Sequence, residues 1–325
     1  MAVSTDWRKA KLAPADHAML EFAEQLTLSP SGMQEENVAA LRRHSFDDRQ
    51  MLSVTLAAAY RNFITRVADA LGVELKVDGG YAPEILRAFG VNEADLQDTI
   101  YGDRQGAAPA PSATSPVQGR GAGHAGAPGK DGCWIDTTPA DPARHAAACQ
   151  ELIRLTAPHS WRNLGLALGR RPEALEAILA FGRLVGMGGS GLGRRLETII
   201  GLVVAATLWV RYMGVHHAQA LLESGAAPAN VERLTEQPAG GTLAGSECEV
   251  ARFCEKLTRQ PSAMCRADVA ALRAAGFADR DIVTIAASAA FESFLCGVAA
   301  GLGVRLEDEA FVPAAEKPFR ATARG

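Results

Sequence analysis

The sequence has few aromatic residues and no excess of basic residues. The first observation limits the folds that we expect, and the second limits the binding partners. Aromatic residues make up 6% of the 325 residues, while alanine is abundant. Because strands favour aromatic and β-branched residues and alanine favours helices, this composition predicts closely packed helices. The net charge is −4, which argues against nucleic acid as the main partner. We therefore expect an all-α protein that does not bind nucleic acid.

The sequence also lacks a long apolar run. Its first residues, MAVSTDWRKAKLAP, contain no apolar stretch of the kind found in a signal peptide. The longest apolar run, residues 198–210, is too short to span a bilayer and predicts a buried helix. These two observations predict a cytoplasmic protein with no membrane partner.

Spacings typical of metal or cofactor sites are missing as well. The six cysteines follow neither a disulfide-framework nor a zinc-site spacing, so we expect reduced thiols and no metal. Residues 186–191 match the glycine pattern of dinucleotide-binding loops, but no strand is predicted before them. We therefore expect no cofactor.

A repeated segment organises the chain. Residues 12–75 align without a gap onto residues 243–306, at a constant offset of 231 positions. The matches include Phe22-Ala-Glu-Gln-Leu-Thr with Phe253-Cys-Glu-Lys-Leu-Thr. Helical apolar spacing and the break at Pro30 predict three helices in each copy. We expect the two copies to superpose as one three-helix unit.

Composition divides the chain into four predicted parts. Residues 1–102 contain the first copy, and residues 144–310 form the main helical domain. Residues 103–143 are rich in glycine, proline and alanine and lack periodicity, which predicts a flexible linker. Residues 311–325 are a C-terminal tail.

Three motifs in the second half of the chain are typical of a known superfamily. They are Met187-Gly-Gly-Ser-Gly-Leu-Gly-Arg-Arg-Leu-Glu197, His216-His-Ala-Gln-Ala-Leu and the Phe253 motif with Ala271-Leu-Arg-Ala-Ala-Gly-Phe277. With them, residues 150–306 resemble the peroxidase-related branch of the alkylhydroperoxidase D (AhpD)-like / carboxymuconolactone decarboxylase superfamily. Residues 1–77 resemble only the second half of such a protein. The resemblance implies a helical bundle that assembles into homo-oligomers, for which the alanine-rich faces at 54–59 and 285–290 are suited.

The cysteine pair of the family peroxidases is missing from this sequence. The resemblance implies Cys-x-x-Cys just before the histidine pair, where one thiolate attacks the peroxide and the second cysteine resolves the sulfenic acid. The corresponding positions hold residues without a thiol: Trp209 and Tyr212 in one register, Val210 and Met213 in the other. A Cys-x-x-Cys peroxidase mechanism is therefore excluded at this site.

The polar residues that remain predict an acid–base site for a small-molecule substrate. Glu197 lies in an apolar helix, where it is either a functional acid or half of an ion pair with Arg194 or Arg195. An unbroken helix would hold Glu197 and His216 about 28 Å apart, so a shared site requires a bend between 207 and 214. The catalytic candidates are Glu197, His216, His217 and Tyr212; the substrate-binding candidates are Trp209, Arg211, Met213, Asn62 and Arg66.

Three functions remain open at this point. The first is an enzyme that uses thiol-independent acid–base chemistry, as the decarboxylase branch of the superfamily does. The second is a catalytically silent family member that acts as a binding or assembly protein. The third is a thiol peroxidase or antioxidant oxidoreductase with relocated cysteines, which needs two cysteine Cα atoms about 4.4–6.8 Å apart.

The missing cysteine pair generates a first prediction. With hydroperoxide and a dithiol reductant the protein should show no robust turnover, measured as consumption of the peroxide. Any weak activity should be unchanged in Cys248→Ser and Cys254→Ser. Strong turnover that either substitution abolishes would place the third function first.

Overall fold

The computed structural model describes residues 6–73, 132–157, 160–239, 243–308 and 311–320. Within these ranges the regular elements are all helices and no strand is present, which confirms the all-α prediction. Most of the predicted linker, and residues 74–102 of the predicted first domain, lie outside the described residues.

Along the chain, a central helical segment lies between the two copies of the repeat. The first copy comprises α2 (Pro14–Leu28), η2 (Pro30–Gly32), α3 (Glu35–Arg43) and α4 (Asp48–Leu71), after a short η1 (Trp7–Lys9). The central segment comprises α6 (Pro142–Thr156), α7 (Arg162–Ala167), α8 (Pro172–Val185), α9 (Arg194–Leu208), α10 (Arg211–Glu223) and α11 (Pro228–Glu236). The second copy comprises α12 (Ser246–Arg259), η4 (Pro261–Ala263), α13 (Arg266–Ala274) and α14 (Asp279–Gly301), followed by α15 (Pro313–Glu316) and η5 (Lys317–Phe319).

The element boundaries of the two copies agree with the aligned register. The bounds of η2 and η4, and those of α3 and α13, differ by the same 231 positions as the sequences. The backbone agrees at the junction too, with ψ 138° at Met33 and 141° at Met264. In the first copy Asp47 and Gln50 cap α4 reciprocally, a capping box that fixes where the helix begins. Superposition of the two complete copies remains a prediction.

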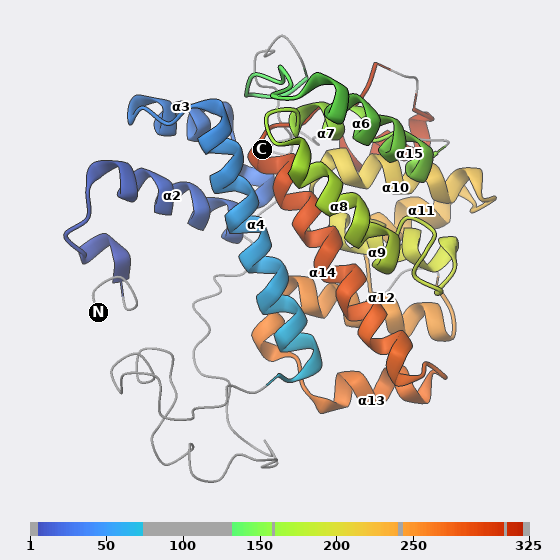
Figure 1. Cartoon of the computed structure of the whole chain (residues 1–325). Helices are drawn as coiled ribbons and strands as arrows, with labels where there is room; N and C mark the ends of the chain where they lie inside the picture. The colour runs from blue at the N-terminus through green and yellow to red at the C-terminus, as the bar shows by residue number, and fades with distance from the viewer. Residues whose placement is uncertain (1–5, 74–131, 158–159, 240–242, 309–310, 321–325) are drawn as a thin grey trace, which may run out of the picture.

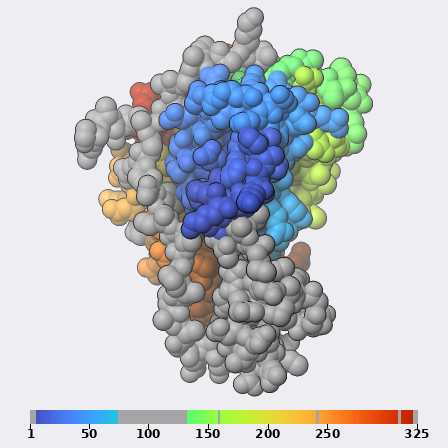
Figure 2. All heavy atoms as spheres, turned by 90° about the vertical axis from the view of Figure 1, so that its left-hand side faces the viewer, coloured from blue at the N-terminus to red at the C-terminus, as the bar shows by residue number. Residues whose placement is uncertain are grey.

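The long helices of the two copies, α4 and α14, pack against each other at the centre of the molecule (Figure 1). Small residues make this close approach possible. A Cβ at Gly297 would lie 3.2 Å from the Cβ of Ala59, and one at Gly301 would lie 2.7 Å from Thr55. Buried apolar residues of both copies and of the central segment belong to one hydrophobic core. The first copy lies over the upper middle of the face shown in Figure 2.

This packing uses part of the alanine-rich faces inside the chain. Ala59 on α4 and Ala286, Ala289 and Ala290 on α14 are buried within the chain itself. Ala57 on α4 is exposed, and assembly through these faces stays a prediction.

Helix α14 is long and apolar enough to cross a membrane by length and composition, with a mean hydropathy of 1.8 over an 18-residue window. Of that window, 83% is buried inside the structure. The core helix of a soluble protein passes the same test, so the finding is weak evidence for a membrane span.

The last part of the predicted linker, residues 132–143, is a docked element and not a flexible one. Cys133, Trp134 and Ile135 are buried, and α6 already begins at Pro142. The Trp134 N–H donates to the Leu302 carbonyl at 2.8 Å. Most of the glycine and alanine that predicted flexibility lies before residue 132, whereas Cys-Trp-Ile supplies apolar surface that the core buries.

The docked Trp134 generates a second prediction, on stability. Gly303 adopts φ +62°, and a Cβ there would lie 2.2 Å from the Trp134 ring. Gly72 is its repeat counterpart, with φ +64° and open space around it. Gly72→Ala should lower the free energy of unfolding by roughly 1–2 kcal/mol, the cost of a left-handed side chain. Gly303→Ala should cost about 1–3 kcal/mol more, because the ring must move.

Urea unfolding of both variants measures this difference, with Gly72→Ala as the matched control. Equal losses in the two variants would mean that Trp134 does not dock against Gly303.

Candidate functional site

The chain bends at Trp209, inside the interval where the acid–base hypothesis requires a bend. Helix α9 ends at Leu208, Trp209 is left-handed (φ 56°, ψ 38°), and α10 begins at Arg211. A left-handed conformation is costly for a large side chain. The ring of Trp209 lies against Phe319, with centroids 5.4 Å apart. The prediction that the helix breaks between 207 and 214 is confirmed.

The bend brings the predicted acid and both histidines to the wall of one cavity, here called cavity A. Its volume is about 420 Å³. Its ionisable lining residues are Glu197, His216, His217, Glu292, Glu223, Arg194 and Arg195. Trp161 and Met187 contribute apolar wall. A cavity of this size falls in the range of small-molecule sites.

The carboxylate of Glu197 holds the glycine-rich loop that precedes α9. It accepts hydrogen bonds from the Gly188 N–H at 2.6 Å, from the Ser190 N–H at 3.1 Å and from the Ser190 hydroxyl. Arg195, one of its expected ion-pair partners, instead pairs with Glu247 at 2.7 Å. Residues 186–191 therefore form a loop that wraps around a carboxylate of the same chain.

His217 is held by a second buried carboxylate, Glu292 on α14. The distance from His217 Nε2 to Glu292 Oε2 is 3.0 Å. The imidazole lies directly on α9, because a Cβ at Gly201 would be 2.3 Å from the ring. Trp161 packs edge-on against it at 5.7 Å. The ring is thus fixed on three sides.

His216 belongs to a different network, built around Glu307. Its Nε2 lies 2.8 Å from Glu307 Oε2, and the Tyr212 hydroxyl donates to Glu307 Oε1 at 2.8 Å. The Asn163 N–H donates to the same oxygen at 2.8 Å. Burial acts to raise the pKa of Glu307, but the hydrogen bond from His216 and its positive charge, with the other donors, lower it below its ordinary value.

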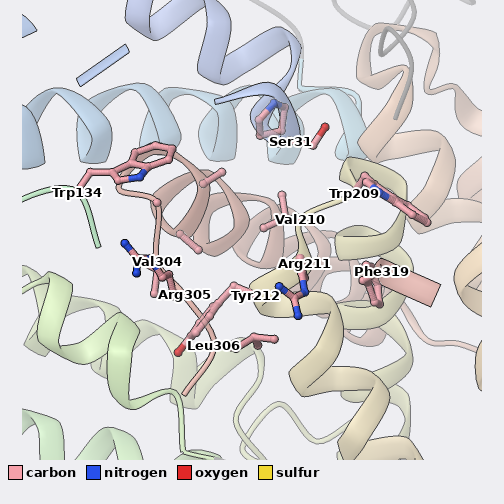
Figure 3. Close-up of a pocket in the computed structure, with 14 residues that line it drawn as sticks. Ser31, Trp134, Trp209, Val210, Arg211, Tyr212, Val304, Arg305, Leu306 and Phe319 are labelled. Carbon is pink, nitrogen blue, oxygen red and sulfur yellow. The ribbon is translucent and has the colours of Figure 1, made fainter. Parts of the chain in front are cut away.

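A second cavity, here called cavity B, lies near the bend and has a volume of about 310 Å³ (Figure 3). Trp209, Arg211 and Tyr212 form part of its wall. Met213 is fully buried and lines neither cavity. The predicted substrate-binding residues are therefore divided between a second cavity and the core.

Asn62 and Arg66, the candidates from the first copy, also lie away from both cavities. The Asn62 amide donates to the Thr27 hydroxyl at 3.0 Å. Arg66 is buried, and its Nη2 donates to the Thr258 carbonyl at 3.5 Å. Burial lowers its pKa to about 10. These two side chains join α4 to α2 and α12.

Glu292 and Glu307 were not predicted. Glu292 is a lone acid in an apolar helix, the same signal that singled out Glu197, so the sequence offered a reason to choose it. Glu307 stands in the acidic run Glu307-Asp-Glu309, where nothing distinguishes it from its neighbours.

The cysteines offer little support for thiol chemistry. No disulfide joins any of the six, all of which the structure describes. Burial raises the pKa of the Cys254 and Cys296 thiols, which disfavours the reactive thiolate. Among the described residues no group of three or more His, Cys, Asp or Glu side chains is placed to hold a metal ion.

Comparisons with known proteins give limited information. No family model matches the chain, and no curated protein does. One solved structure is similar in fold: an uncharacterized peroxidase-related protein with an alkylhydroperoxidase AhpD core, from Ralstonia eutropha JMP134. It is 23% identical, covers 53% of this chain and 90% of its own, and has a TM-score of 0.47. These values are too low for the likeness to indicate a function.

The Glu307 network generates a third prediction. A lowered carboxyl pKa stabilises the fold above the ordinary value of 4.5, and this contribution is lost as the pH falls further. Glu307→Gln should therefore lower the free energy of unfolding by about 2–4 kcal/mol at pH 7. The difference from the unmodified protein should shrink between pH 5 and 3, measured by urea unfolding at each pH.

Glu232→Gln is the control, because Glu232 pairs with Lys317 at the surface. Its loss should stay below about 1 kcal/mol at every pH. A loss in Glu307→Gln that does not depend on pH would show that the carboxylate is not ionised in this network.

Proposed function

We propose that the protein is a small-molecule enzyme that moves protons without thiols, with His217 and Glu292 as the proton-transferring pair in cavity A. The observation that carries this proposal is an imidazole, held by a carboxylate, on the wall of a cavity large enough for a metabolite. Glu197 shares the cavity and holds the loop that carries Met187 into its wall.

His217 is the better candidate of the two histidines because it is more open to the cavity. The side chains of His217 and Glu292 are 8% and 10% exposed, against 2% and 4% for His216 and Glu307. Glu292 holds Nε2 of His217, which leaves Nδ1 as the nitrogen that exchanges a proton with a ligand. The carboxylate stabilises the imidazolium that forms when the ring accepts a proton.

Arg194 suggests a carboxylate as the substrate. It lies exposed at the rim of cavity A, and no acidic side chain in the described ranges forms an ion pair with it. An arginine fork binds a carboxylate with two parallel hydrogen bonds. The superfamily whose peroxidase-related branch residues 150–306 resemble also has a decarboxylase branch, and the namesake substrate of that branch is a carboxylated lactone.

The step proposed for His217 is proton transfer at a carbon next to a carbonyl. As a base, the imidazole takes the carbon's proton and the electron pair moves onto the carbonyl oxygen as an enolate. In a decarboxylation the bond to the carboxylate breaks instead, carbon dioxide leaves, and the electron pair of that bond moves onto the carbonyl oxygen as the enolate. An imidazolium that has taken its proton from solvent then donates it to the carbon. The first variant needs the ring as a base and the second needs it as an acid, and neither needs an oxidant.

A silent binding protein is the second candidate. The observation in its favour is that the carboxylate of Glu197 is already engaged by three donors of its own loop. A residue occupied in this way holds structure and is poorly placed to exchange protons. The experiment below distinguishes the two candidates.

Deuterium exchange provides the fourth prediction. In deuterated water the protein should accelerate exchange of the acidic C–H protons of small keto and lactone carboxylates, including carboxymuconolactone, as followed by proton NMR. His217→Gln and Glu292→Gln should each reduce the rate by about 100-fold or more. The double variant should lose little beyond either single one, because the two residues act as a unit.

His44→Gln, which alters an exposed histidine at the end of α3, is the control and should exchange at the unmodified rate. Binding of the same carboxylates without any acceleration of exchange would favour the silent binding protein. Exchange that survives His217→Gln would remove His217 from the chemistry.

A further inference from the structure

We infer that cavity B is a second ligand site, for a small aromatic carboxylate, and that it binds independently of cavity A. It is built from segments that are far apart in sequence: the start of η2, the docked Trp134, the first turn of α10, the end of α14 with residues 303–306, and η5. None of the residues that line it lines cavity A.

Aromatic rings form the ends of cavity B. Figure 3 shows Trp134 and Trp209 at opposite ends, with Arg211 and Tyr212 between them. Phe319 lies beside Trp209, with ring centroids 5.4 Å apart. Aromatic walls of this kind favour a flat ring as the ligand, since rings stack face to edge or offset on one another.

Two arginines give the cavity its charge preference. Arg211 is the first residue of α10, and Arg305 follows α14; both line the cavity. Helix α10 begins without a side-chain cap at Val210, so the positive end of its dipole adds to their charge. Two guanidinium groups beside aromatic walls match a ligand that joins a ring to a carboxylate.

The main chain holds Arg305 in place from both sides. Its N–H donates to the Gly132 carbonyl at 2.8 Å, and its own carbonyl accepts from the Asn163 amide at 3.0 Å. Arg211 is less constrained: it pairs with Glu316 at 3.3 Å, and its side chain is 46% exposed. A long, exposed ion pair of this kind contributes little to the stability of the fold, so a ligand carboxylate can replace Glu316 as the partner of Arg211.

Two glycines make room for the aromatic walls. A Cβ at Gly303 would lie 2.2 Å from the Trp134 ring, and one at Gly214 would lie 2.2 Å from the Phe319 ring. Gly214 lies inside α10, where glycine is unfavourable compared with alanine. Gly303 follows α14 and is left-handed (φ +62°), a conformation that favours glycine, so only Gly214 goes against local preference. At both positions the missing side chain leaves the space that an aromatic ring occupies.

The volume limits the size of the ligand. At about 310 Å³, cavity B is near the lower end of the range for small-molecule sites. One or two fused rings with a single carboxylate are the class that fits both the volume and the charge. We use 2-naphthoate as the probe and its neutral amide, 2-naphthamide, as the matched ligand.

The experiment is a titration of the full chain with each probe, followed by ligand-observed NMR and by tryptophan fluorescence. Naphthoate should bind about tenfold or more tightly than naphthamide, because a hydrogen bond to a charged group is worth that factor. Arg211→Gln and Arg305→Gln should each remove this preference and leave naphthamide binding unchanged. Arg305→Lys, which keeps the charge, should retain part of it.

Arg43→Gln, which alters an exposed arginine outside both cavities, is the control and should bind naphthoate as the unmodified chain does. The inference is separate from the proposed function, because a protein inactive in deuterium exchange should still bind naphthoate. Equal affinity for the two probes would overturn the inference. Loss of naphthoate binding in Arg194→Gln in place of Arg305→Gln would also overturn it, by placing the carboxylate in cavity A.

Discussion

The close packing of α4 against α14 is the constraint on which the rest of the molecule depends. Because Gly297 and Gly301 bring the two helices together, α14 is enclosed along most of its length. Glu292 lies on the opposite side of α14 from these glycines, where α14 packs against α9 and α10, and it pairs there with His217. The end of α14 supplies part of the wall of cavity B. The helix that packs against α4 thus contributes residues to both cavities.

The bend at Trp209 separates the two cavities and Glu307 joins them. Successive turns of α10 carry Tyr212 into the wall of cavity B and His216 into the wall of cavity A. Both side chains are hydrogen-bonded to the two oxygens of the same Glu307 carboxylate. One buried charge therefore fixes a wall residue of each cavity.

Local signals in the sequence predict where the helices lie, but they do not predict the partners of the buried charged residues. The Asp47 cap and the break after Leu28 depend on residues close to one another in the chain. The bend at Trp209 has no such local signal and was inferred only from the hypothesis of a shared site. The pairs His217–Glu292 and His216–Glu307 span 75 and 91 residues, and no periodicity predicts such contacts. Glu197 illustrates the limit: its position in an apolar helix was evident from the sequence, but its hydrogen bonds to a loop seven to nine residues upstream were not.

Three buried carboxylates line or join the cavities, and they differ in the hydrogen-bond donors that hold them. Glu197 is held by two backbone N–H groups and a hydroxyl, and Glu307 by a backbone N–H, a phenol and an imidazole. Each of these sets contains donors that keep their protons at neutral pH. In the described part of the chain Glu292 has a single donor, the imidazole of His217. This difference in donors is the reason why the proposed function assigns proton transfer to His217 and Glu292 and not to the other two carboxylates.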